Sequence, residues 1–337
     1  NNIVHWDGVT GNFLGVLVEK PKDTQLASSV TLGPDGNLYV GWDGKSTNEK
    51  TILPASVRQY DPVTGEQLGI FATFEMEPDN SREKLDAMVF APNGQLLVFD
   101  NIGWGSKRKL WRFQGLNEPS PGAFVDLFIT RDNDGFPGEK SFEVWDLDFD
   151  EQGRLLVPRA ARHEILIYSA PEVGGGWSCL LDVFASVREY GENTGCGYEP
   201  DFGGFADPNV VGFDSSRMTT PYGIGWGPDG NLYVSVTDAF WTDTRERYYL
   251  GRIMYYAPTG EFLGDFVSTD EFSAITLDRP QELDFGPDGN LYVATKDANV
   301  LVFGAPNGPR AGQHIGTLAV PEWVKSNGST SLQFIVD

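Results

Sequence analysis

Five short segments of the chain repeat one pattern, in which a glycine-centred turn is followed by apolar residues. The eight residues Gly33–Val40 recur unchanged at Gly227–Val234 and Gly286–Val293, with looser copies at Ala91–Val98 and Asp150–Val157. In each copy a glycine, usually after Asp or Asn, supplies the positive φ of a tight turn. Leu-Tyr-Val or Leu-Leu-Val then begins a strand. The pattern therefore predicts five β-hairpins.

The spacing of these hairpins indicates one repeated structural unit. The turn glycines are Gly36, Gly94, Gly153, Gly230 and Gly289, which lie 58, 59, 77 and 59 residues apart. Regular steps of this size are typical of a repeat protein, and the long third step indicates an insertion. We place this Gly- and aromatic-rich insertion at about residues 190–218.

Each unit contains four strand signals. In the fourth unit they are Gly223–Trp226 before the turn, Leu232–Val234 after it, then Arg252–Tyr256 and Glu261–Phe266. Four antiparallel strands repeated around one axis form a β-propeller, in which each sheet buries both faces against its neighbours. The sequence therefore predicts an all-β propeller of four-stranded blades.

The two ends of the chain match different parts of the repeat. Trp6–Gly15 matches Tyr60–Gly69, a third and fourth strand, whereas Thr330–Asp337 matches Gln281–Asp288, a first strand. We therefore expect residues 1–337 to form one six-bladed domain whose last blade is closed by both termini and is incomplete in this sequence. Either a longer chain or a neighbouring molecule would supply its second strand.

Composition and charge narrow the choice of partners. The chain of 337 residues has 40 Gly, 21 Pro and 13% aromatic residues, which suits many short strands and turns. Its formal net charge is -23. We expect no nucleic-acid partner because the phosphate backbone would be repelled. No apolar run approaches the roughly 18 residues of a membrane span, so we expect no membrane insertion.

The redox state of the two cysteines would indicate in which cellular compartment the protein works. Cys179 and Cys196 are the only cysteines, and they flank a Gly-rich stretch. A disulfide between them would suit a secreted protein, extracellular or periplasmic, whereas two thiols would suit a cytosolic one. No signal peptide is visible, so we expect a mature or trimmed form.

The run from Pro221 to Val234, Pro-Tyr-Gly-Ile followed by Pro-Asp-Gly-Asn-Leu-Tyr-Val, resembles the NHL-repeat family. It is also similar to the wider group of six-bladed propellers that includes gluconolactonases, regucalcin-like lactonases, streptogramin lyases and the peptide-amidating lyase. The resemblance implies the propeller fold across nearly the whole chain. It says little about activity, because the matched residues belong to turns and core.

In lactonase-like relatives a divalent cation lies in the central channel, near the starts of the inner strands. The matching positions here are seven and eight residues before each turn glycine, and they include Asp86, Asp146, Glu282 and Gln281. The three carboxylates would suit Ca²⁺, which prefers oxygen ligands, or would act as acid–base groups. Alternatively, they are solvated residues of the rim. The fourth blade lacks the matching Asn ligand, which weakens the calcium interpretation.

Several other residues are candidates for a ligand or partner surface. We expect the exposed ones to stack on sugars or to anchor a protein, although aromatic residues also pack between blades. They are Trp145, Tyr222, Gln281 and Arg159 near the channel, and Trp42, Trp104 and Trp241 in loops or at strand ends.

Three functions remain open. The first is a secreted, non-catalytic propeller that binds a protein partner or copies of itself. The second is a calcium-dependent lactonase-like hydrolase or lyase at the channel mouth, with Arg159 or Tyr222 orienting the substrate. The third is a carbohydrate-binding propeller. Serine-hydrolase and phosphate-binding motifs are absent from the sequence, and His5, His163 and His314 occupy different repeat positions, which disfavours a zinc site.

We predict a disulfide between Cys179 and Cys196. Mass spectrometry after alkylation without reductant should find neither thiol modified, and reduction should expose both. Because the bond closes a short loop, the Cys179→Ser/Cys196→Ser variant should lose about 3 kcal/mol of unfolding free energy. Alkylation of both thiols in the unreduced protein would contradict the prediction.

Overall fold

The computed structural model describes most of the chain as β-strands joined by turns. The described residues are 2–24, 26–46, 52–74, 84–100, 109–130, 144–160, 164–171, 180–186, 220–241, 247–268, 277–296, 299–318 and 332–334. They contain no α-helix, and thus no helix of the length and apolar character that crossing a membrane requires.

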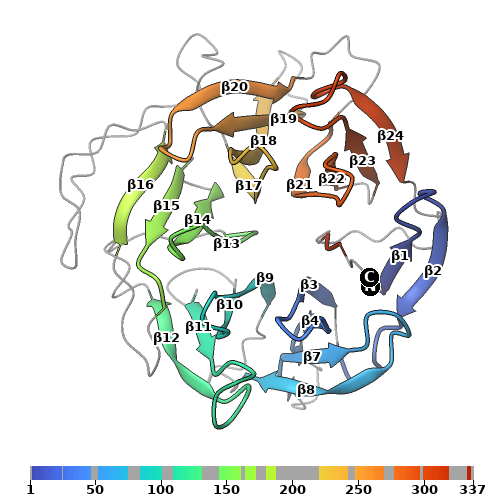
Figure 1. Cartoon of the computed structure of the whole chain (residues 1–337). Coiled ribbons are helices and arrows are strands. Elements are labelled where there is room, and N and C mark those ends of the chain that lie inside the picture. The colour runs from blue at the N-terminus through green and yellow to red at the C-terminus, as the bar shows by residue number, and fades with distance from the viewer. Residues whose placement is uncertain are drawn as a thin grey trace.

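Five four-stranded antiparallel sheets are arranged around a central axis (Figure 1). The first two sheets are β3 (Ala27–Leu32), β4 (Leu38–Trp42), β7 (Ser56–Tyr60) and β8 (Gln67–Thr73), then β9 (Leu85–Phe90), β10 (Leu96–Asp100), β11 (Lys109–Phe113) and β12 (Phe124–Thr130). The third is β13 (Asp148–Phe149), β14 (Leu155–Arg159), β15 (Glu164–Tyr168) and β16 (Leu180–Ser186). The last two are β17 (Pro221–Trp226), β18 (Leu232–Trp241), β19 (Arg247–Tyr256) and β20 (Phe262–Val267), then β21 (Pro280–Phe285), β22 (Leu291–Thr295), β23 (Val300–Phe303) and β24 (His314–Leu318).

The predicted propeller of four-stranded antiparallel sheets is confirmed, but the number of sheets differs from the prediction. The described residues form five four-stranded sheets rather than six. The N-terminal strands β1 (Ile3–Trp6) and β2 (Phe13–Val18) form a two-stranded sheet, and β5 (Lys45–Ser46) pairs with β6 (Ile52–Leu53). Of the predicted C-terminal strand, residues 332–334 are described, and they form no strand ladder.

The repeated turn is held by its aspartate side chain. In the first sheet, Asp35 Oδ2 accepts hydrogen bonds from Asn37 Nδ2 at 2.7 Å and from Tyr39 Oη at 3.1 Å. Asp229 and Asp288 bind the matching Asn and Tyr residues of their own turns in the same way. The shared spacing of Asp, Asn and Tyr within the repeat therefore fixes the direction of the tyrosine ring.

The tyrosine ring in turn fills the joint between neighbouring sheets. The ring centroid of Tyr233 lies 4.9 Å from that of Phe285, at the end of the next sheet's first strand. A Cβ atom on Gly227 would lie 2.5 Å from Tyr233 Cε2, so the ring requires glycine at this position. In the second repeat, where Leu97 replaces the tyrosine, the glycine position holds Ala91. Gly and Tyr at these two positions are therefore coupled by direct contact.

We predict that Gly227→Ala destabilises the protein through this contact. Its Cβ would force the buried Tyr233 ring to shift, at a cost of about 1–3 kcal/mol. In a Tyr233→Leu background the same substitution should cost less, because the ring atoms are gone. Thermal and urea unfolding of all four proteins would measure the coupling. Gly69→Ala is the control, because no atom lies within 4 Å of its added Cβ. Equal costs in the two backgrounds would contradict the proposed contact.

Candidate functional site

The inner strands of the ring bring side chains from several sheets to one end of the channel. The first strands of the five sheets lie closest to the axis (Figure 1). Lys84 precedes β9, Trp145 lies shortly before β13, and Tyr222 lies near the start of β17. Gln281 and Glu282 belong to β21. Since equivalent strands of a propeller run in the same direction, these residues belong to one channel mouth.

A cation and two aromatic rings form a row across this mouth. Lys84 Nζ lies 4.7 Å from the ring centroid of Trp145, and the Trp145 and Tyr222 ring centroids are 5.9 Å apart. All three side chains are partly exposed. The Trp145 indole nitrogen is buried and has no hydrogen-bond partner. We call Lys84, Trp145 and Tyr222 the mouth row. It offers apolar ring surface and a cation.

Asp86 forms an ion pair with Lys84 of the mouth row. Lys84 Nζ lies 2.6 Å from Asp86 Oδ1 and 2.7 Å from Oδ2, and the Asp86 side chain is fully buried. Nearby, Asp43 accepts hydrogen bonds from the Ser28 hydroxyl and from the Leu85 backbone N–H, the latter at 3.0 Å. Burial raises the pKa of Asp43 to about 6, and the negative charge of Asp86 adds to the shift. This group of polar residues joins the first sheet to the second.

Asp146 ties the third sheet to the fourth. Its Oδ2 accepts a hydrogen bond from the Ile224 backbone N–H at 2.9 Å, and its Oδ1 accepts one from Leu147 N–H at 2.8 Å. Burial raises the pKa of Asp146 well above its usual range, and the charges of Asp148 and Asp284 raise it further. Asp146 therefore holds the strand carrying Tyr222 beside its own neighbour Trp145.

Asp148 and Asp284 lie near Asp146 in the channel wall. Burial raises the pKa of Asp148 to about 7, with a contribution from the charge of Asp284, and raises the pKa of Asp284 to about 6. All three side chains keep some accessible surface, as groups lining a narrow channel do. The sequence reasoning missed Asp148 and Asp284. The available signal was their common position, five residues before a turn glycine.

The three predicted calcium ligands are not assembled into a metal site. Among the residues that the structure describes, no group of three His, Cys, Asp or Glu side chains is placed to hold a metal ion. Asp86 is paired with Lys84, and Asp146 binds two backbone N–H groups. Glu282 is partly exposed on β21. Calcium binding by Asp86, Asp146 and Glu282 remains a prediction.

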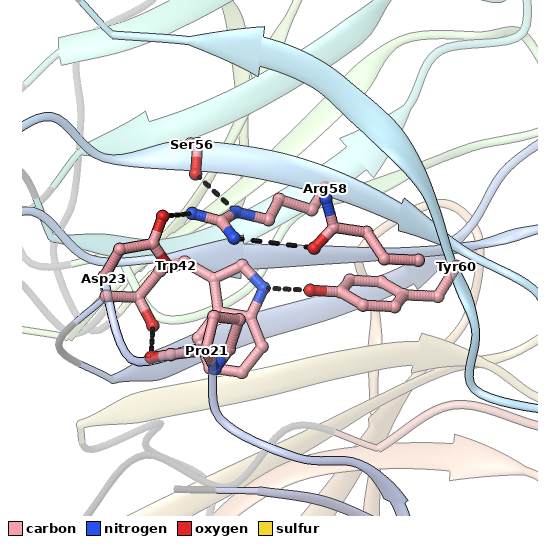
Figure 2. A network of polar contacts seen from close by, with 8 residues as sticks. Pro21, Asp23, Trp42, Ser56, Arg58 and Tyr60 are labelled. Carbon is pink, nitrogen blue, oxygen red and sulfur yellow. Dashed lines mark hydrogen bonds and ion pairs between the residues drawn. The ribbon is translucent and has the colours of Figure 1, made fainter.

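Two predicted surface residues are buried instead. Trp42 is 0% exposed and donates its Nε1 hydrogen to Tyr60 Oη at 3.0 Å (Figure 2). Arg159 is 2% exposed and forms an ion pair with Glu164 on the neighbouring strand. Neither side chain contributes to an exposed surface, because each is satisfied by a partner within its own sheet.

The remaining predicted positions lie outside the described part of the chain. They are Trp104, the side chain of Trp241, both cysteines Cys179 and Cys196, and the insertion at about 190–218. The pairing of the cysteines remains a prediction.

Comparison with known proteins supports the fold. No family model and no curated protein matches the chain. A protein of unknown function from Bacteroides caccae is 12% identical, with 98% of this chain and 93% of that chain covered and a TM-score of 0.54. The fold is a β-propeller.

Two further similar structures carry names. A proposed oxidoreductase (glucose dehydrogenase) from Thermus thermophilus is 15% identical, with 92% of this chain and 88% of that chain covered and a TM-score of 0.49. A gluconolactonase from Xanthomonas campestris is 12% identical, with 92% and 81% covered and a TM-score of 0.44. Identities this low carry no activity over to this propeller.

We predict that the stability of the propeller falls as pH rises, because the folded state raises the pKa values of Asp148 and Asp284. An unfolded aspartate has a pKa near 3.8, so the folded state binds more protons above that value. The stabilisation is complete below about pH 4 and is lost as pH rises through about 6 and 7. Asp148→Asn should therefore raise the unfolding free energy at about pH 8 by about 2 kcal/mol and flatten the pH profile.

Thermal unfolding across this pH range would measure the effect. Glu151→Gln, in an exposed turn of the same sheet, is the matched control and should keep the wild-type profile. A wild-type protein whose stability rises from about pH 5 to about pH 8 would contradict the prediction.

Proposed function

We propose that this protein is a non-catalytic binding propeller that holds a carbohydrate at the channel mouth. The supporting observation is the mouth row, in which partly exposed Trp145 and Tyr222 rings lie 5.9 Å apart beside the Lys84 ammonium group. The C–H faces of a sugar pack on aromatic rings, and its hydroxyl groups accept hydrogen bonds from donors such as the partly exposed Lys84 ammonium group. The row combines both kinds of contact.

The nearby carboxylates favour binding over catalysis. Asp86 is paired with Lys84, and Asp146 accepts two backbone hydrogen bonds. Both side chains thereby stabilise the inner strands. A catalytic carboxylate would need a free oxygen within hydrogen-bond reach of the reacting group. These contacts give Asp86 and Asp146 structural roles.

Charge further limits the ligand. The formal net charge of -23 disfavours anionic sugars, so we propose a neutral or cationic carbohydrate. The acidic composition with two closely spaced cysteines also leads us to propose a secreted protein, extracellular or periplasmic.

A calcium-dependent lactonase-like hydrolase or lyase is the second candidate. The observation that favours it is the group formed by Asp146, Asp148 and Asp284, whose raised pKa values suit proton transfer near neutral pH. Calcium would require Asp86 and Asp146 to exchange their present hydrogen-bond partners for the ion. We therefore place this candidate after carbohydrate binding.

We predict that the mouth row carries ligand affinity. Screening a panel of neutral and amino sugars, followed by isothermal titration calorimetry, should identify a ligand. Trp145→Ala and Tyr222→Ala should each weaken its binding by about tenfold or more, because each removes a ring contact. Phe124→Ala is the control, since Phe124 is a 52% exposed ring on the outer strand β12. Unchanged affinity in both mouth variants would place the ligand elsewhere.

The same preparations distinguish binding from catalysis. The proposal expects no turnover of lactones or of the identified ligand, with or without added Ca²⁺. Hydrolysis that requires Ca²⁺ and is lost in Asp148→Asn would instead support the second candidate.

A further inference from the structure

The inner strands of four sheets share a β-bulge at the channel mouth. In each of these sheets the first strand has one residue more than the second strand between two consecutive ladder pairs. The bulges fall at Ser28 of β3, Asp86 of β9, Tyr222–Gly223 of β17 and Gln281–Glu282 of β21. A bulge bends its strand and re-aims a side chain, and bulges are common beside functional sites. The repeated bulge therefore marks the side chains that are turned toward the mouth.

The bulge position lies eight residues before the turn glycine, and it divides the mouth into two sides. In the first two sheets this position holds Ser28 and Asp86, which are buried and bound to other residues of the protein. In the other three sheets the residue at this position is partly exposed. These residues are Trp145, Tyr222 and Gln281. A ligand at the mouth therefore meets side chains of the third, fourth and fifth sheets.

Close backbone contact brings the bulge of the fifth sheet beside that of the fourth. A Cβ atom on Gly223 would lie 2.4 Å from the Gln281 carbonyl oxygen and 2.8 Å from Glu282 Cα. The strands β17 and β21 are neighbours at the inner side of the ring (Figure 1). Glycine after Tyr222 permits this approach because it has no side chain to separate the two strands. Gln281 thus lies next to the end of the mouth row that Tyr222 forms.

A buried hydroxyl group fixes the spacing of these two bulges. Ser235, on β18, accepts a hydrogen bond from the Gly223 backbone N–H at 2.8 Å. Its hydroxyl group donates to the Gln281 carbonyl oxygen at 2.6 Å. Ser235 is 0% exposed, so both bonds are shielded from water. The backbone that carries Tyr222 and the backbone that carries Gln281 are therefore held together before any ligand binds, which lowers the ordering cost of binding.

We propose that Gln281 continues the mouth row and that the mouth binds an oligosaccharide of at least two sugar units. This inference rests on the proposed function, carbohydrate binding at the mouth row. The Trp145 and Tyr222 rings are inclined by 40°, so they present two separate surfaces, each suited to one sugar unit. The first unit packs on Trp145. The second packs on Tyr222, where the donor and the acceptor of the Gln281 amide bind two of its neighbouring hydroxyl groups.

Isothermal titration calorimetry with matched sugars would test the second unit. The probes are neutral monosaccharides and the disaccharides built from them: glucose with maltose and cellobiose, mannose with mannobiose, and N-acetylglucosamine with chitobiose. At least one disaccharide should bind about tenfold or more tightly than its monosaccharide, because the second unit adds the contacts with Tyr222 and Gln281. The ratio of the two affinities is the quantity to compare between variants.

Variants of Gln281 locate the second unit. Gln281→Ala should lower the affinity for the disaccharide to about that for the monosaccharide, whereas Trp145→Ala should weaken the binding of both. Gln281→Glu keeps the size of the side chain but removes its N–H donors, and it should also lower the ratio. Gln313→Ala is the matched control, because Gln313 is an exposed glutamine in the turn between β23 and β24, at the far end of the same sheet. Thermal unfolding of each variant would separate loss of binding from loss of fold.

The outcomes distinguish this inference from the proposed function. Equal affinity for every monosaccharide and its disaccharide, with both weakened by Trp145→Ala, would overturn the second unit and leave carbohydrate binding at the mouth row in place. A preference for the disaccharide that both Gln281 variants retain would also overturn the inference, because the second unit would then lie elsewhere. Binding of none of these sugars would overturn the inference and the proposed function together.

Discussion

Tyrosine side chains at the joints between neighbouring sheets set the spacing on which much of the propeller depends. Tyr39, Tyr233 and Tyr292 each contact a phenylalanine of the segment that follows, and each hydroxyl group donates to the aspartate of its own turn. Burial raises the pKa of all three tyrosines, so the rings stay neutral and can fill the joint. These contacts position β9, β21 and residues 332–334, whereas the second and third sheets have Leu97 and Leu156 at the tyrosine position.

The joints near the channel mouth depend on polar side chains instead. Asp43 accepts the Leu85 N–H, Asp146 accepts the Ile224 N–H, and the Ser235 hydroxyl donates to the Gln281 carbonyl at 2.6 Å. Each bond connects one sheet with the next at the start of an inner strand. Placing carboxylates at these joints costs desolvation free energy, which hydrogen bonds from backbone N–H groups offset in part. The mouth row is therefore built on the same bonds that hold the sheets together.

The strands were predictable from sequence because their signals are local. A turn glycine followed by Leu-Tyr-Val specifies a hairpin without reference to any other part of the chain. Burial at strand ends was not predictable in this way. Trp42 and Arg159 end their strands, yet Tyr60 and Glu164 on neighbouring strands cover and satisfy them. Recognising those partners requires the register between strands, which one sequence does not supply.

The channel carboxylates show the same limitation. The sequence placed Asp86 and Asp146 at adjacent repeat positions, eight and seven residues before a turn glycine, but their partners, Lys84 and the Ile224 N–H, come from different elements. The charge of Asp284 in the fifth sheet acts on Asp148 in the third sheet only because the ring turns both toward the same channel. The sequence repeats every sheet in the same order, but the contacts across the axis depend on how many sheets the ring contains.

The hairpin β1–β2 lies between the first and fifth sheets, and polar contacts hold the segment that follows it (Figure 1). Buried Arg58 binds Asp23, in the segment between β2 and β3, at 2.8 Å, and also binds Ser56 (Figure 2). A buried guanidinium requires such partners, so it draws this segment onto the first sheet. Ile3 and Leu17 of the hairpin pack with the same sheet, whereas Phe334 packs on the fifth. The hairpin and Phe334 are thus held by opposite neighbours in the ring.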